Sequence, residues 1–237
     1  MKIALLNYSG NVGKTTLARD LLKFRLQEYE LITIESSNAD GKEELIIRGE
    51  DRDKLYTELL LADDVILDIG SSNLESFFKS SKKESEIISN INIFIVPTTP
   101  ELKQQQDTIK TIKDLLENNV NANQIHIIAN QVVFDTYTTV TDTFSDLIAV
   151  TNALNINFNF KYAIERHDLY KNGQILAEML SEEDYRAKME EAKTHGDKRN
   201  ARILANKYIR QKKIRKLNEH YQMIFDNVIN SREKNYE

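Results

Sequence analysis

Six short apolar runs, separated by stretches of helical periodicity, constrain the fold of this chain more than any other feature. The runs lie at residues 3–7, 31–34, 65–69, 91–96, 125–129 and 156–162. Most are nearly continuous in Ile, Val and Leu, which is typical of strands covered on both faces of a parallel sheet. Two of the intervening stretches, 15–29 and 101–118, carry apolar residues at helical spacing. The alternation predicts an α/β fold with a doubly wound, mostly parallel sheet.

The C-terminal part of the chain has a different pattern. We expect the α/β domain to span residues 1–180 and a charged helical extension to span 181–237, where no strand pattern is found. The tripeptide 195–197, His-Gly-Asp, predicts a break between two helices. In the second of these helices apolar residues recur at 3,4,3,4 spacing: Ile214, Leu217, Tyr221, Ile224 and Val228. Such a stripe predicts an amphipathic helix that docks on the domain or pairs with another chain.

Composition excludes several classes of protein. The absence of cysteine excludes a disulfide scaffold, a thiolate zinc site and a cysteine nucleophile. The four histidines are scattered and have no metal-ligand spacing. No apolar run approaches the roughly 18 residues that span a bilayer, and the first run is too short for a signal peptide. We therefore expect a cytoplasmic protein without a membrane anchor.

A glycine-rich segment lies between the first apolar run and the first helical stretch. Its sequence is Tyr8-Ser9-Gly10-Asn11-Val12-Gly13-Lys14-Thr15-Thr16. Glycines in this context let backbone N–H groups approach phosphate oxygens, and a lysine adds a positive charge for the terminal phosphates. We expect Lys14 to contact those phosphates and Thr15 to offer its hydroxyl to Mg²⁺. The alternative is a glycine turn that only joins a strand to a helix.

An aspartate ends the third apolar run, in Val65-Ile66-Leu67-Asp68-Ile69-Gly70. At the carboxyl end of a parallel strand its carboxylate faces the crevice in which such sheets bind ligands. Asp68 is therefore a candidate Mg²⁺ ligand, and Gly70 gives the following loop room near a γ-phosphate. The alternative role for Asp68 is capping of the next turn.

The glycine-rich segment resembles the deviant phosphate loop of the ParA/MinD family of ATPases, which reads K-G-G-x-G-K-T. The matching residues are Gly10, Gly13, Lys14 and Thr15. Asn11 replaces the second glycine, and Ser9 stands where the family has its signature lysine, which reaches across a dimer to the partner's nucleotide. A V-P-x-x-P-E turn at 96–101 is also similar to the family. The resemblance implies a P-loop NTPase fold, ATP and Mg²⁺ as cofactors, and a homodimer.

The resemblance also suggests roles for residues after the second and fifth runs. Glu35 matches the first of two family aspartates, whereas Ser37 stands at the second, which positions the attacking water, and Asp40 is three residues further on. With Lys14, Glu35 and Asp68 as the catalytic candidates, we expect a slow or partner-stimulated ATPase. Asn130 aligns with the asparagine that hydrogen-bonds adenine. The alternatives are that Glu35 and Asp40 are solvated loop acids and that Asn130 only ends a strand.

Because the loop lacks the signature lysine, the chain looks most similar to the StbB-type plasmid stability proteins. That resemblance implies a nucleotide switch in plasmid partition or stability, linked to conjugation, with a DNA-binding adaptor protein as partner. Two other functions compete with it. One is a catalytically inactive P-loop protein that binds DNA or a partner, and the other is a metabolic P-loop kinase or ligase, for which no second catalytic constellation is visible.

Residues 198–216 form a basic segment with nine Lys or Arg residues and no acid, whereas the rest of the chain has 23 basic and 37 acidic residues. Basic residues on a helix suit non-specific contacts with DNA phosphates. The candidate DNA-binding residues are Arg199, Arg202, Arg210, Lys212, Lys213, Arg215 and Lys216. Two alternatives are a solvated helix that pairs with the acidic domain and, less favoured for want of Trp, Phe and Leu, a helix on an anionic membrane surface.

Overall fold

The computed structural model describes the chain except for residues 35–44, 48–50, 84–85, 135–138 and 231–237. It divides into two compact units, Met1–Arg166 and His167–Glu237. The sequence places the boundary at residue 180, whereas the second unit of the structure begins at His167. Each unit has its own buried residues.

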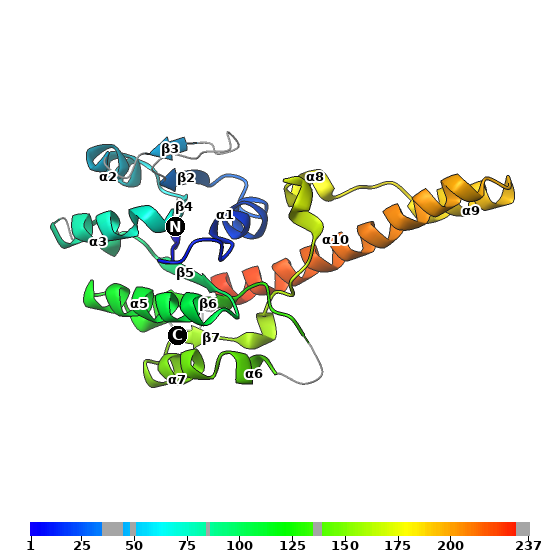
Figure 1. Cartoon of the computed structure of the whole chain (residues 1–237). Coiled ribbons are helices and arrows are strands. Elements are labelled where there is room, and N and C mark those ends of the chain that lie inside the picture. The colour runs from blue at the N-terminus through cyan, green and yellow to red at the C-terminus, as the bar shows by residue number, and fades with distance from the viewer. Residues whose placement is uncertain (35–44, 48–50, 84–85, 135–138, 231–237) are drawn as a thin grey trace. The chain divides into compact units, whose positions relative to one another are not determined.

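The first unit is built on a seven-stranded sheet in which all the strand pairs of the described residues are parallel. The order is β3-β2-β4-β1-β5-β6-β7 (Figure 1). The strand bounds are β1 Lys2–Leu5, β2 Glu30–Ile34, β3 Leu45–Ile47, β4 Val65–Ile69, β5 Ile93–Thr98, β6 Ile125–Ala129 and β7 Asn157–Phe158. The predicted doubly wound parallel α/β fold is thus confirmed.

Two edge strands differ from the prediction. β3 was not expected, because a three-residue strand carries too little periodicity to be recognised. At the other edge, the predicted strand over 156–162 is wrong beyond Phe158, since β7 has two residues and a 3-10 turn, η4 (Phe160–Tyr162), follows. The Asn159 side chain accepts a hydrogen bond from Lys161 N at 3.1 Å, which turns the chain away from the sheet.

One face of the sheet is covered by α2, α3, α5 and α7, which Figure 1 shows together beside the strands. The helix bounds are α2 Arg52–Leu61, α3 Leu74–Lys83, α4 Glu86–Ser89, α5 Leu102–Glu117, α6 Val140–Thr143 and α7 Ser145–Ala153, with 3-10 turns η2 at Ser71–Asn73 and η3 at Ala122–Gln124. Side chains such as Phe77 of α3 and Leu115 of α5 are buried in one continuous core with alternate strand residues. The predicted helix over 101–118 is therefore confirmed as α5.

The first helical stretch lies on the opposite face. A short helix α1 (Lys14–Thr16) continues without interruption into η1 (Leu17–Lys23), in which the turns are π-helical. Leu17, Leu21 and Leu22 of this stretch are fully buried. Because Ile66 and Asp68 alternate with core-facing residues of β4, they face this second side of the sheet.

The second unit contains a long helix paired with a short one. Its elements are η5 Leu169–Asn172, α8 Leu176–Met179, α9 Tyr185–Thr194 and α10 Lys198–Asn230. The predicted break at 195–197 is confirmed, since Gly196 has a φ of 73° and Asp197 Oδ1 accepts from Asn200 N at 3.0 Å at the start of α10. All five residues of the predicted apolar stripe of α10, which begins at Ile214 and ends at Val228, are buried.

Candidate functional site

The predicted phosphate loop connects β1 to α1 and is held by its own lysine. Lys14 Nζ donates to the carbonyl oxygens of Ser9 at 2.8 Å and Asn7 at 3.3 Å. The side chain is only 8% exposed, so it curls over the loop rather than extending into solvent. The lysine therefore keeps a charged amine at the centre of the loop, where an incoming phosphate can exchange with the two carbonyls.

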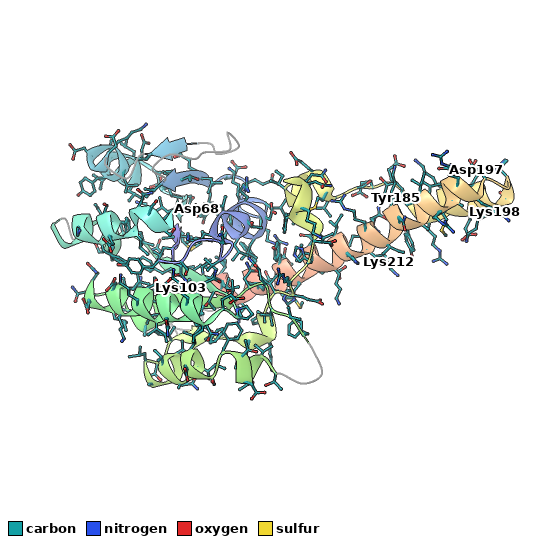
Figure 2. The ribbon with its side chains drawn as sticks, in the orientation of Figure 1. Asp68, Lys103, Tyr185, Asp197, Lys198 and Lys212 are labelled. Atoms are coloured by element: carbon teal, nitrogen blue, oxygen red, sulfur yellow. The ribbon has the colours of Figure 1, made fainter. Side chains whose placement is uncertain are left out.

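The two predicted Mg²⁺ ligands are in direct contact. Thr15 Oγ1 donates to Asp68 Oδ2 at 2.6 Å, and Asp68 is 2% exposed at the end of β4. Asp68 is labelled in Figure 2. Hydroxyl and carboxylate oxygens are ligands that Mg²⁺ prefers, and Mg²⁺ is commonly held by one or two such groups together with water and substrate phosphates. The residues present thus fit a magnesium ion that arrives with a nucleotide.

Gly13 lies where no side chain can be accommodated. Its φ is 93°, and a Cβ there would lie 2.3 Å from Asn130 Nδ2. The Asn130 amide in turn donates to Val12 O at 2.9 Å. The structure therefore brings Asn130, from the end of β6, directly against the predicted phosphate loop.

The Asn130 amide retains hydrogen-bonding capacity beyond its protein contacts. Its Oδ1 accepts from Gln131 N at 2.9 Å and its Nδ2 uses one hydrogen on Val12 O. A carboxamide has two N–H donors and two acceptor lone pairs, so one of each remains. One donor and one acceptor are what the N7 and N6 edge of adenine requires.

Gln131 contacts the predicted phosphate loop, which the sequence did not predict. Its Nε2 donates to Asn11 O at 3.0 Å, and both residues have positive φ, 55° for Gln131 and 58° for Asn11. Left-handed backbone is costly for residues other than glycine, and side-chain bonding helps to maintain it. A polar residue after a strand gives no signal of which loop it will reach, so this pairing was not visible in the sequence.

The first half of the loop is bonded to α5. Fully buried Asn7 donates through Nδ2 to Pro97 O and Thr108 Oγ1, both at 2.8 Å, and accepts from Ser9 N at 2.8 Å. Ser9 Oγ donates to Asp107 Oδ2 at 2.6 Å. The serine at the position of the family's lysine is therefore engaged with an acid of this chain.

Tyr8 adds a second link between the loop and α5. Its N–H donates to Thr111 Oγ1 at 3.2 Å, its hydroxyl donates to Asp114, and Lys110 Nζ lies 3.8 Å from its ring centre. Burial, and then the hydrogen bond to Asp114, raises the pKa of the Tyr8 phenol above its usual value. Residues 7 to 9 and α5 form one hydrogen-bonded assembly.

We expect Asn7→Ala to lower the free energy of unfolding by about 2–3 kcal/mol, because the buried groups bonded to the amide lose a partner and a buried unsatisfied group costs about 1–3 kcal/mol. Urea unfolding followed by circular dichroism measures the change. Asn118→Ala, which removes a part-buried amide bonded to Asp114 O at 2.7 Å, is the control and should cost less. Equal stability of Asn7→Ala and the wild-type chain would contradict the role of the amide.

The remaining predicted loop residues are placed as follows. Gly10 lies beside the segment after β4, where a Cβ would be 3.7 Å from Ser71 Oγ. Thr16 is half-buried in α1. The catalytic candidate Glu35, with Ser37 and Asp40, lies outside the described residues.

The basic residues of 198–216 all lie on α10, and most are exposed. Arg210 is half-buried and donates to Gln174 Oε1 at 3.1 Å, and Arg215 donates to Ser181 O at 3.5 Å. Lys212 is exposed, with its Nζ 5.5 Å from the Tyr208 ring centre. Figure 2 shows Lys198 at the end of α10 beside α9 and Lys212 further along the helix. The other exposed candidates are Arg199, Arg202, Lys213 and Lys216.

In the part of the chain that the structure describes, no cluster of three or more His, Asp or Glu side chains could hold a metal ion. No helix in that part of the chain has the length and apolar character needed to cross a membrane.

No protein-family model and no curated protein sequence matches this chain. Solved structures with a similar fold include MinD-type and partition-type proteins. A chain of the MinC:MinD complex from Aquifex aeolicus is 13% identical, with 72% of this chain and 83% of that chain covered and a TM-score of 0.46. MinD from Pyrococcus horikoshii OT3, complexed with Mg-ADP, is 14% identical over 73% and 84%, with a TM-score of 0.43. A candidate plasmid partition protein from Borrelia burgdorferi B31, bound to AMPPNP, is 17% identical over 67% and 90%, with a TM-score of 0.42.

Proposed function

We propose that this chain binds ATP with Mg²⁺ at residues 10–16 and acts as a nucleotide-dependent switch of the ParA/MinD type. The observation that carries the proposal is the Thr15–Asp68 contact of 2.6 Å at the foot of a loop whose lysine is already folded inward. The sequence predicts both residues as Mg²⁺ ligands, although they lie 53 residues apart in the chain. A turn that only joined β1 to α1 would need neither.

In this proposal each residue of the site has a defined task. Lys14 leaves the carbonyl oxygens of Asn7 and Ser9 and contacts the terminal phosphates. Thr15 and Asp68 hold the magnesium ion, which neutralises phosphate charge when bound. Gly13 allows the backbone to approach the phosphates, and Asn130 hydrogen-bonds the adenine edge through its remaining donor and acceptor.

Hydrolysis is proposed to be slow or to depend on a partner. Phosphoryl transfer needs an oriented water and compensation of developing negative charge. Ser9 supplies no such charge and instead donates to Asp107. Glu35 is a proposed catalytic residue, and Ser37 stands where the family has the aspartate that positions the attacking water. Phosphate release, measured with and without DNA, tests the proposal. Sustained phosphate release that is lost in Lys14→Ala would reject the alternative hypothesis of a catalytically inactive interaction protein, which does not turn over nucleotide.

The finer biological role rests on the resemblance of motifs. We propose plasmid partition or stability of the StbB type, linked to conjugation, with a DNA-binding adaptor protein and a second copy of the chain as partners. A neighbouring open reading frame for a small DNA-binding protein beside direct repeats would support this role. Sedimentation of the chain with and without ATP and Mg²⁺ tests the proposed homodimer.

A second proposed activity, non-specific DNA binding, is favoured by the exposed basic residues of α10. If four of them contact phosphates, a plot of log K against log salt concentration should fall with a slope of about −3.6. Gel-shift titrations on random DNA at several salt concentrations measure the slope. The salt-dependent affinity for DNA should be lost in a variant in which four basic residues of α10 are changed to Gln: Arg199, Arg202, Lys213 and Lys216. The control variant has the same number of changes to Gln in the first unit: Lys103, Lys110, Lys113 and Lys161. Equal affinity of both variants would remove the proposal.

A further inference from the structure

Thr33 is a polar residue buried between two isoleucines near the end of β2. It is 1% exposed, and its Oγ1 has no hydrogen-bond partner among the described residues. The flanking residues Ile32 and Ile34 are apolar and buried. A buried hydroxyl without a partner costs free energy that valine, which has the same shape, would not. Packing therefore does not explain a hydroxyl at this position.

The sheet places Thr33 beside the proposed magnesium ligand. Thr33 of β2 is the Cα partner of Asp68 in β4. Neighbouring strands lie about 4.8 Å apart, and residues paired in parallel strands point to the same face. In the sheet order β4 has two neighbours: β1, which leads into the loop with Thr15, and β2, which carries Thr33. Thr33 and Asp68 thus share the face covered by η1.

The Asp68 carboxylate accepts a hydrogen bond from Thr15 in this structure, where Thr15 Oγ1 donates to Asp68 Oδ2. A hydroxyl oxygen can bind Mg²⁺ through a lone pair while its hydrogen still bonds a carboxylate, so this contact is compatible with a bound metal. A carboxylate accepts several hydrogen bonds, and ligands in metal sites are commonly oriented by such bonds from neighbouring groups. A second hydroxyl beside Asp68 would help to hold the carboxylate as a ligand.

We propose that Thr33 is a positioning residue of the magnesium site, whose hydroxyl donates to the Asp68 carboxylate when the metal and nucleotide are bound. This inference rests on the proposed binding of ATP with Mg²⁺. It adds a residue that neither the motifs nor the direct contacts of the loop assign. Thr33 is paired with Asp68 in the sheet, so in this proposal it acts through that carboxylate and not on the nucleotide.

The test compares Thr33→Val, which removes the hydroxyl, with Thr33→Ser, which retains it. Isothermal titration calorimetry measures ATP affinity in excess Mg²⁺ and again in EDTA. We expect Thr33→Val to bind ATP roughly ten-fold more weakly than the wild-type chain in Mg²⁺, the lower end of the effect of such positioning groups. In EDTA its affinity should equal that of the wild-type chain, and Thr33→Ser should behave as wild type in both conditions.

Thr98→Val is the matched control. Thr98 is also fully buried and its Oγ1 also has no partner in the described part of the chain, but it lies in β5 and pairs with Ala129. This variant should bind ATP as the wild-type chain does in both conditions. The melting temperature of ligand-free Thr33→Val should be at or above the wild-type value.

Three outcomes are distinguishable. Equal Mg²⁺-dependent affinity of Thr33→Val and the wild-type chain would overturn the role of Thr33 while leaving the proposed function intact. An equal loss of affinity in Mg²⁺ and in EDTA would also overturn it, because it would indicate a structural effect. Absence of ATP binding by the wild-type chain would instead remove the proposed function.

Discussion

Lys14→Ala should abolish the stabilisation that ATP and Mg²⁺ give to the wild-type chain. A ligand that binds only the folded state at 100 times its Kd raises the free energy of unfolding by about 2.7 kcal/mol. The lysine is the one cation that the structure places within the described part of the loop, where it bonds two backbone carbonyls. Without it the phosphates meet no positive side chain there. Thermal melting with and without 100 Kd of ATP in Mg²⁺ measures the difference.

The control for this prediction is Lys103→Ala. Lys103 is exposed in the first turn of α5 and is labelled in Figure 2. Its removal changes the net charge by the same amount as Lys14→Ala but leaves the loop intact, so the shift in melting temperature should remain. A full shift in Lys14→Ala would contradict the assignment of the loop, and no shift in the wild-type chain would contradict nucleotide binding itself.

The central fold could be predicted because its signals are local. The run at Val65–Ile69 is apolar at every position except Asp68, and it forms a strand that is buried over its whole length. The edges could not be predicted equally well. β3 has three residues, and the run that includes Asn157 was divided by a side chain-to-backbone bond at Asn159. Edge strands have fewer neighbours, so local bonds of this kind decide where they end.

The predicted phosphate loop shows the same division between local and long-range information. The spacing of the two glycines before Lys14 and Thr15 predicts the loop. The position of Asp68 at the end of an apolar run predicts that residue as a candidate metal ligand. The partners of Asn7 and Ser9 on α5 could not be inferred, since they lie 98 to 101 residues further along the chain. Asp107 has no distinguishing spacing of its own. Asp107 gains a role only because the folded chain brings α5 against residues 7–9.

Gly13→Ala should have the second large effect, on stability and on nucleotide binding together. The new Cβ would lie 2.3 Å from Asn130 Nδ2, and the backbone at φ 93° is unfavourable for any other residue. The strain alone costs about 1–3 kcal/mol. To relieve the contact Asn130 must move, which breaks its 2.9 Å bond to Val12 O and displaces the loop. Urea unfolding should show the destabilisation, and calorimetry should show no ATP binding.

Gly10→Ala separates the loss of glycine in general from the geometry of Gly13. At Gly10 the added Cβ would make an ordinary contact of 3.7 Å with Ser71 Oγ, and its φ lies outside the left-handed region. This variant should therefore be as stable as the wild-type chain, or slightly more stable, because alanine restricts the unfolded state. Adding Asn130→Ala to Gly13→Ala removes the steric contact but not the backbone strain, so it should restore only part of the stability. Full recovery in the double variant would show that the contact with Asn130, and not the conformation of Gly13, requires glycine in this loop.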